Sequence, residues 1–204
     1  MGCRRRLEAV ARGFSLIELM VVISIFGILT SILVYKNSDF NNTILLTNVA
    51  YEVALTIRQA QVYGVNVSSA GGANFRSGYG VNINMASADQ MTLFSDQFVG
   101  NAPEGDYIYD SSELLSQINF TRGYSIKGFC LKNLSAGGNQ DCFTNGSSAE
   151  VAIVFVRPNP DAHIRYKNGN TTVEYDQIEI TITTQDGTKT KTVLVTNTGQ
   201  ITIQ

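Results

Sequence analysis

The chain has 204 residues, of which 44% are hydrophobic and 16% are charged, and its formal net charge at pH 7 is −2. This length suits one anchored globular domain, and a second domain is not expected. The negative balance argues against a general nucleic-acid-binding protein or a protein that binds anionic membranes, because both need a basic surface.

An apolar segment near the N-terminus dominates the chain. Residues 14–35, FSLIELMVVISIFGILTSILVY, contain one ionisable side chain before Tyr35, namely Glu18. A helix of this length measures about 33 Å and would cross a hydrocarbon core of about 30 Å. Four arginines and Glu8 precede it, so the positive-inside rule predicts a cytoplasmic leader, residues 1–13, and translocation of residues 36–204.

A secretory signal peptide and a lipid anchor are the competing interpretations of this N-terminus. The apolar run is longer than the usual signal-peptide core of about 7–15 residues, and no small-x-small site follows it. Myristate on Gly2 with palmitate on Cys3 is disfavoured, because Arg6 stands where the myristoylation motif requires Ser or Thr. We therefore expect a membrane-spanning anchor.

Glu18 is unusual in such a segment. A carboxylate at the centre of a membrane helix costs on the order of 2.5–3.5 kcal/mol unless it finds a partner. Cleavage between Gly13 and Phe14 would create an amino group close to Glu18, and the two charges would neutralise each other within one subunit or between neighbours. A shallow Glu18 that reaches the headgroups is the alternative.

Residues 12–23, RGFSLIELMVVI, resemble the class III leader and helix start of type IV prepilins and type II secretion pseudopilins. The resemblance implies that a prepilin peptidase cleaves after Gly13 and N-methylates Phe14. It also implies that Glu18 directs docking of the subunit into a growing helical filament. The kinking proline of many type IV pilins is absent from residues 31–37, which favours a pseudopilin or minor subunit.

Residues 36–64 are predicted to form the amphipathic half of the same helix. After a polar stretch at residues 36–43, which is either a frayed turn or helix, apolar residues recur at spacings of three and four at Leu46, Val49, Val53, Ile57 and Ala60. We expect Gly64 and the Ser- and Gly-rich run after it to end the helix. Residues 54–65 are similar to the stretch that follows the anchor in the GspH and FimT branch. That similarity leaves a docking role for Arg58 open beside a solvated helix face or a local ion pair.

Residues 65–204 are predicted to form a globular β-rich domain. The fold class is therefore α+β, with a long N-terminal helix packed on a mainly antiparallel sheet. We expect residues 79–83 to be a strand with one buried face and residues 151–156 a central strand covered on both faces. The other predicted strands are residues 91–94, residues 125–132, an edge strand around His163 and a closing meander over residues 178–203. Residues 95–123 and 136–149 are expected to be irregular.

Cys130 and Cys142 are the cysteines that remain once the leader, with Cys3, is removed. In a translocated domain such a pair usually forms a disulfide, which here would tie a flexible loop to the sheet. A free buried pair is the alternative. A zinc site is disfavoured, because His163 is the only histidine that could join the two thiols.

The irregular stretch contains four carboxylates: Glu104, Asp106, Asp110 and Glu113. Calcium prefers oxygen ligands, but no D-x-D-x-D-G loop is present, so a solvated acidic loop is favoured over a metal site. No cofactor is expected. The chain is predicted not to be an enzyme, because His163 is the only imidazole and no hydrolase elbow, P-loop, dinucleotide-binding or metalloprotease motif occurs.

These patterns lead to a functional hypothesis. The resemblance implies a minor pilin or pseudopilin of the GspH or FimT kind, a single-pass inner-membrane protein with its C-terminal domain outside the cytoplasm. Its partners would be prepilin peptidase and other subunits of a type II secretion pseudopilus or type IV pilus, with no nucleic acid. Removing residues 1–13 changes the net charge to −5, and Gln200 stands where the branch often has arginine, which weakens any analogy to DNA-binding members. The alternative is an unprocessed, membrane-anchored β domain that binds a ligand or substrate and does not polymerise.

Overall fold

The computed structural model describes residues 13–66, 77–97, 105–134, 137–168 and 171–204. The chain divides into two compact units, Met1–Asn41 and Asn42–Gln204. One helix, α1 (Leu16–Val65), contributes to both units. The prediction of a single long helix is confirmed, and the polar stretch at residues 36–43 is helical.

The second half of α1 has one buried face. The predicted stripe is confirmed, since Leu46 and Val49 are 2% and 9% exposed and the three later members are fully buried. The helix ends at Val65, one residue after Gly64, and the Ser- and Gly-rich run expected to help end it lies outside the described residues. A Cβ at Gly64 would stand 2.3 Å from the carbonyl oxygen of Phe155, so glycine is required for close contact between α1 and the sheet.

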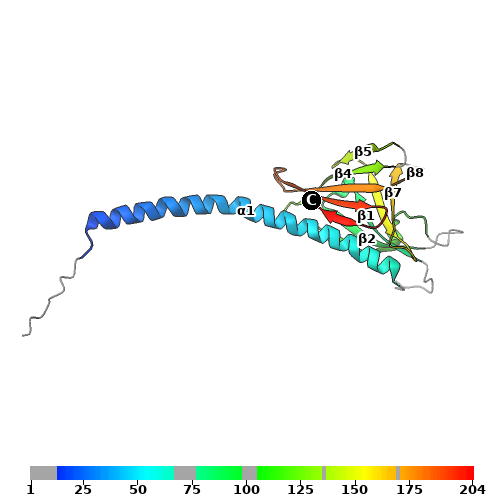
Figure 1. Ribbon diagram of the computed structural model, residues 1–204, viewed down its shortest axis with the longest axis horizontal. Coiled ribbons are helices and arrows are strands. Elements are labelled where there is room, and N and C mark those ends of the chain that lie inside the picture. The colour runs from blue at the N-terminus through cyan, green and yellow to red at the C-terminus, as the bar shows by residue number, and fades with distance from the viewer. Residues whose placement is uncertain (1–12, 67–76, 98–104, 135–136, 169–170) are drawn as a thin grey trace, which may run out of the picture. The chain divides into compact units, whose positions relative to one another are not determined.

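Two antiparallel sheets form the rest of the second unit. The six-stranded sheet has the order β3 (Leu114–Asn119), β2 (Gln90–Asp96), β1 (Gly78–Asn84), β6 (Glu150–Phe155), β7 (Ala162–Asn168), β8 (Thr171–Tyr175). The five-stranded sheet has the order β11 (Ile201–Ile203), β10 (Thr190–Thr196), β9 (Gln177–Thr183), β4 (Ser125–Asn133), β5 (Asn139–Thr144). Two short 3-10 helices, η1 (Met85–Ser87) and η2 (Ser111–Glu113), connect strands. This α+β layout agrees with the predicted fold class (Figure 1).

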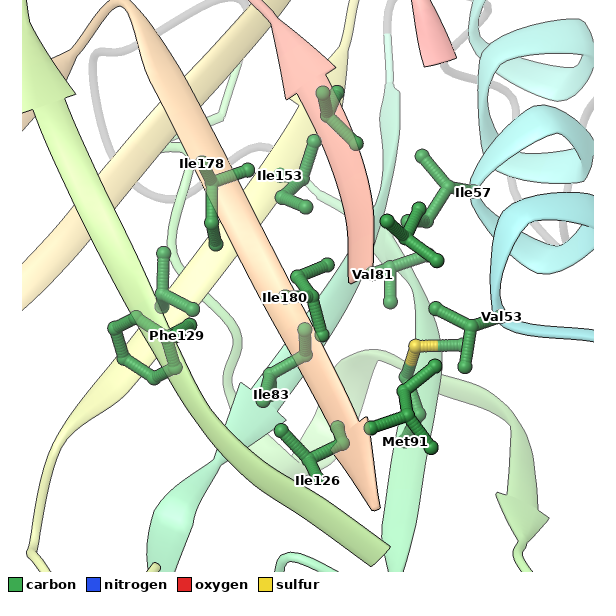
Figure 2. Close-up of a cluster of buried hydrophobic side chains, with 14 of the residues drawn as sticks. Val53, Ile57, Val81, Ile83, Met91, Ile126, Phe129, Ile153, Ile178 and Ile180 are labelled. Atoms are coloured by element: carbon green, nitrogen blue, oxygen red, sulfur yellow. The ribbon is translucent and has the colours of Figure 1, made fainter. Parts of the chain in front are cut away.

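The main core is filled by side chains from α1 and from both sheets (Figure 2). Val53 and Ile57 of α1 meet Val81 of β1, and Ile178 and Ile180 of β9 enter the same cluster; all five are fully buried. The predicted meander over residues 178–203 is confirmed as β9, β10 and β11, paired in that order. The alternating isoleucines and valines of these strands therefore form one wall of the core.

The six-stranded sheet is buried on both faces near its centre. The prediction of a central, doubly covered strand is confirmed for β6, because Ile153 belongs to the main core and Val154 belongs to a second cluster on the opposite face. The prediction of a single buried face for β1 is wrong, since Asn82 is only 4% exposed. Gly80 is buried too, and a Cβ there would lie 2.8 Å from the ring of Phe94.

Three further expectations are wrong. Residues 95–123 contain the strand β3, and residues 136–149 contain the strand β5. Both are edge strands with mostly exposed side chains, so their sequences lack the apolar alternation that would indicate a strand. The strand that carries His163 is not an edge strand, because β7 pairs with β6 on one side and β8 on the other.

Candidate functional site

The expected processing site lies immediately before the helix. Gly13 and Phe14 are exposed and precede the first residue of α1, Leu16, while Glu18 lies in the first helical turn. The N–H of Leu19 donates to the carbonyl of Ser15 over 3.1 Å, which is among the first hydrogen bonds of the helix. The arginines of the leader lie outside the described residues. The Gly13–Phe14 peptide bond therefore stands outside regular secondary structure.

The first half of α1 presents an almost wholly apolar surface. Its segment Leu16–Val34 is long and apolar enough to cross a membrane. The large apolar side chains from Phe14 to Val34 are exposed, from 45% for Val22 to 82% for Phe14. The hydroxyls of Ser24 and Thr30 donate over 2.8 Å to carbonyls one turn earlier, so these groups need no outside partner. Such a surface is stable only in lipid or against other apolar helices.

Glu18 is the single ionisable group on this surface. Residues 13–34 include no lysine, arginine or histidine, so Arg12, in the leader, is the nearest basic side chain to Glu18 in the sequence. A negative charge in the first turn is favoured by the helix dipole, but that effect does not replace a counter-charge in lipid. The nearest cation that this stretch could supply is the amino group of Phe14 after cleavage.

The two mature cysteines form a disulfide. Cys130 on β4 and Cys142 on β5 are directly paired across the strands, with their Cα atoms 4.1 Å apart. The predicted bond is therefore present, but the expectation that it ties a flexible loop to the sheet is wrong, because Cys142 lies in a strand. The bond fastens the edge strand β5 to its only neighbour in the five-stranded sheet.

Arg58 organises a contact between α1 and two loops. Its guanidinium donates to the side-chain oxygen of Gln61, and the amide nitrogen of Gln61 donates to the carbonyls of Pro160 and Gly199 over 3.0 Å each. Gln61 is only 6% exposed, whereas Arg58 is exposed. Of the alternatives for Arg58, the exposed side chain agrees with the solvated helix face, and it donates to Gln61 rather than to an acidic residue. Beside Arg58 lies a shallow groove of about 390 Å³ between α1 and β11, lined by Tyr51, Ala54, Leu55, Ile201, Thr202 and Ile203.

The acidic stretch is solvated only in part, since Asp110 is exposed and Asp106 half-buried but Glu113 is buried. Glu104 lies outside the described residues, but Glu113 is only 4% exposed and accepts the backbone N–H groups of Gln97 and Asp110 over 2.8 and 3.1 Å. Burial raises the pKa of the Glu113 carboxyl above its usual range. The described parts of the chain hold no cluster of three or more histidine, cysteine or acidic side chains arranged for a metal ion.

His163 is a hydrogen-bonded surface residue, as expected. Its Nδ1 lies 2.9 Å from a carboxylate oxygen of Glu174, and its ring stacks on Tyr107 with centroids 4.4 Å apart. Asp96, at the end of β2, was not singled out by the sequence, yet it is fully buried and contacts the same stretch as Tyr107. No motif surrounds Asp96, so no local pattern could have indicated it.

Comparison with known proteins gives a result confined to the N-terminus. No match was found among curated proteins, and none was found among solved structures. The family model described as the prokaryotic N-terminal methylation motif matches residues 10–34. This stretch contains Gly13, Phe14, Glu18 and most of the exposed apolar helix, and the match supports a type IV pilin-like chain processed by prepilin peptidase.

Proposed function

We propose that the chain is a non-catalytic structural subunit, a minor pilin or pseudopilin, that is assembled into a filament through its N-terminal helix. One observation carries this proposal: the residues that match the methylation motif also form a helix whose large apolar side chains are uncovered. The same surface would lie in lipid before assembly and against other apolar helices afterwards. Storage in the membrane and packing in a filament then need only one kind of surface.

The proposed location is the inner membrane, crossed once, with the leader in the cytoplasm and the β domain on the other side. The basic leader supports this orientation. The disulfide between Cys130 and Cys142 supports it independently, because such bonds persist in oxidising compartments outside the cytoplasm. Prepilin peptidase and other filament subunits are the proposed partners, and nucleic acid is not among them.

We assign the processing and assembly roles to three residues. The peptidase cleaves between Gly13 and Phe14 and methylates the new amino terminus. Glu18 then pairs with the Phe14 amino group of its own or a neighbouring subunit. The lack of a basic side chain among residues 13–34 supports this assignment, because the terminus is the nearest available cation.

We further propose that the subunit belongs to the GspH or FimT kind and serves a type II secretion pseudopilus or a type IV pilus. The support comes from residues 54–65, which are similar to that branch, with Arg58 and Ala60 at the typical spacing. The closing Thr198-Gly199-Gln200-Ile201 is similar as well, although Gln200 departs from the arginine often found there.

Mass spectrometry of the amino terminus of protein isolated from its native cell tests the proposal. A chain that begins with methylated Phe14 is the expected result. A variant with Gly13→Leu is the matched control, since a bulky residue at the cut should leave the leader attached. If the unmodified protein retains residues 1–13, the filament assignment is wrong and an unprocessed, membrane-anchored binding domain takes its place.

A further inference from the structure

A second apolar cluster lies on the face of the six-stranded sheet opposite the main core. Phe94 of β2 and Ala152 and Val154 of β6 form it, and each is at most 3% exposed. Neither α1 nor the five-stranded sheet supplies its cover. Tyr107, Tyr109 and Val156 pack on the cluster instead, and the rings of Phe94 and Tyr109 meet edge to face with centroids 5.4 Å apart.

The two tyrosines of this cover belong to residues 105–113, a segment that we call the strap. Most of the strap has no regular secondary structure before it ends in η2. Tyr107 has a φ of 60°, in the left-handed region that residues other than glycine rarely adopt. The strap is therefore held in place by its contacts rather than by its own conformational preference.

Two buried carboxylates accept hydrogen bonds from the backbone of the strap. Asp96 is fully buried and accepts the backbone N–H groups of Asp106 and Tyr107 over 3.3 and 3.1 Å. At the C-terminal end of the strap, the Glu113 carboxylate accepts hydrogen bonds from the N–H groups of Gln97 and Asp110. No salt bridge in the described parts of the chain joins a cation to either carboxylate.

The charged groups around Asp96 disfavour its ionised form. Burial is the largest influence and raises its pKa to about 7; the carboxylates of Glu113 and Asp106 act in the same direction, against the bonds from the strap N–H groups. From β7, Arg165 lies over the Tyr107 ring at 4.7 Å, donates to the backbone carbonyl of Asp106 over 3.4 Å and pairs with Glu174 of β8 at 3.6 Å. His163, also on β7, stacks on the Tyr107 ring, and the strap itself carries the carboxyl groups of Asp106, Asp110 and Glu113.

We propose that the strap is a proton-linked cover: it stays closed over Phe94, Ala152 and Val154 while Asp96 carries a proton, and it opens more often once Asp96 is ionised. A protonated carboxyl keeps an acceptor oxygen, so its bonds to the strap N–H groups survive protonation. Opening the strap lets water reach Asp96 and removes the penalty on its charge. By linkage, a proton that binds the closed form more tightly must favour closure.

The sign and the pH window of the effect follow from the two pKa values of Asp96. An exposed aspartate has its ordinary value of 3.8, and the closed strap raises it to about 7. Between these values the closed form binds more protons than the open form, so the equilibrium constant for closure falls as the pH rises. Above about pH 7 both forms are ionised and the constant levels off.

Hydrogen exchange of the full chain in lipid nanodiscs, followed from pH 5 to pH 8.5 and corrected for intrinsic rates, tests this proposal. The opening constants for the amides of Asp106 and Tyr107 should rise at least tenfold between pH 5 and pH 7 and then change little. The amides of Ala152 and Val154, which lie in the β6 ladder, serve as the internal control and should follow global stability alone. If the opening constants of the strap amides in the wild-type chain stay constant or fall as the pH rises, the proposal is wrong.

Two substitutions test which titratable side chain causes the pH dependence of strap opening. Asp96→Asn keeps the shape and an acceptor oxygen but cannot ionise, so the amides of Asp106 and Tyr107 should lose most of their rise, and what remains should come from Glu113, whose pKa burial also raises. His163→Gln removes the imidazole that stacks on Tyr107 and should leave the wild-type profile in place. If His163→Gln flattens the profile and Asp96→Asn does not, the imidazole is the sensor and the proposal is wrong. None of these readouts depends on filament formation, so the inference stands or fails separately from the proposed function.

Discussion

Gln61 on α1 donates its side-chain amide to the carbonyl of Gly199, a residue 138 positions later in the chain, over 3.0 Å. The same nitrogen also donates to the carbonyl of Pro160, and the guanidinium of Arg58 donates to the side-chain oxygen of Gln61. Through one buried side chain the helix is therefore joined to the loop before β7 and to the turn before β11. Satisfied polar groups of this kind fix the position of a helix more specifically than apolar contacts do.

Replacing Gln61 should destabilise the folded domain. Gln61→Leu leaves the carbonyls of Pro160 and Gly199 without this donor in a buried place, and we expect a loss of about 1–3 kcal/mol in the free energy of unfolding. Urea unfolding of the full chain in detergent, followed by far-UV circular dichroism, measures it. Gln59→Leu is the matched control on the exposed side of the same turn and should change stability by less than about 0.5 kcal/mol. Equal effects of the two substitutions would contradict this role of Gln61.

Removing the disulfide should weaken the domain and loosen β5 in particular. For a cross-link of this loop length the expected loss is on the order of 3 kcal/mol in the Cys130→Ser, Cys142→Ser double variant. The urea midpoint gives the global effect, and exchange of the β5 amides gives the local one. Cys3→Ser is the control, because this cysteine takes no part in the Cys130–Cys142 bond. Unchanged protection of β5 would show that its pairing with β4 suffices without the bond.

Tyr175 should ionise at a higher pH than an ordinary tyrosine, whose pKa is 10.0. It is 9% exposed and donates to a carboxylate oxygen of Asp141 over 2.7 Å. Burial, followed by this hydrogen bond, raises its pKa from 10.0 to about 12. The folded chain therefore keeps a proton that the unfolded chain releases, and stability should fall as the pH rises from about 10 to about 12.

Ultraviolet absorbance of the folded protein measures the Tyr175 titration directly. We expect a late step of one tyrosine in the wild type and its loss in Tyr175→Phe. Tyr51→Phe is the control, because Tyr51 is 55% exposed and its removal should leave the late step of Tyr175 in place. A wild-type titration with no late step would refute the shifted pKa.

Replacing Glu18 should separate membrane insertion from assembly. Glu18→Ala removes the one charge of the apolar helix, so insertion should be unchanged or improved. Incorporation into filaments should fall by about tenfold, because a polar contact between membrane helices is worth about 1–2 kcal/mol. Carbonate extraction of membranes and the subunit content of sheared filaments measure the two effects. Ser24→Ala is the control, since that hydroxyl bonds within its own helix. Normal incorporation of the alanine variant would remove Glu18 from the assembly mechanism.

The sequence predicted the parts of the fold whose apolar pattern is periodic. The stripe from Leu46 to Ala60 repeats every three or four residues, and the run at 151–156 is continuously apolar, so each had one plausible structure. The edge strands β3 and β5 carry no such pattern, because exposed side chains are free to be polar. Their positions are set by backbone pairing with β2 and β4, which a single sequence does not encode locally.

The N-terminal motif was predictable for a different reason. Gly13, Phe14 and Glu18 lie within the matched motif, and their proposed roles depend on their spacing along one segment, which is visible in the sequence. Asp96 and Tyr107 act through contacts between a strand end and a chain segment that folds back on it. Before the structure, nothing indicated that residues 105–113 would cover the sheet, and for the same reason the burial of Asn82 was missed.

The uninterrupted course of α1 has a mechanical consequence. A pull on the second half of α1 would load the side chains, such as Val53 and Ile57, that it buries in the main core. These contacts resist sliding in parallel and yield together, whereas strands peeled from an edge would give way one bond at a time. If the chain is extracted from a bilayer as proposed, these core contacts would keep the β domain attached to α1.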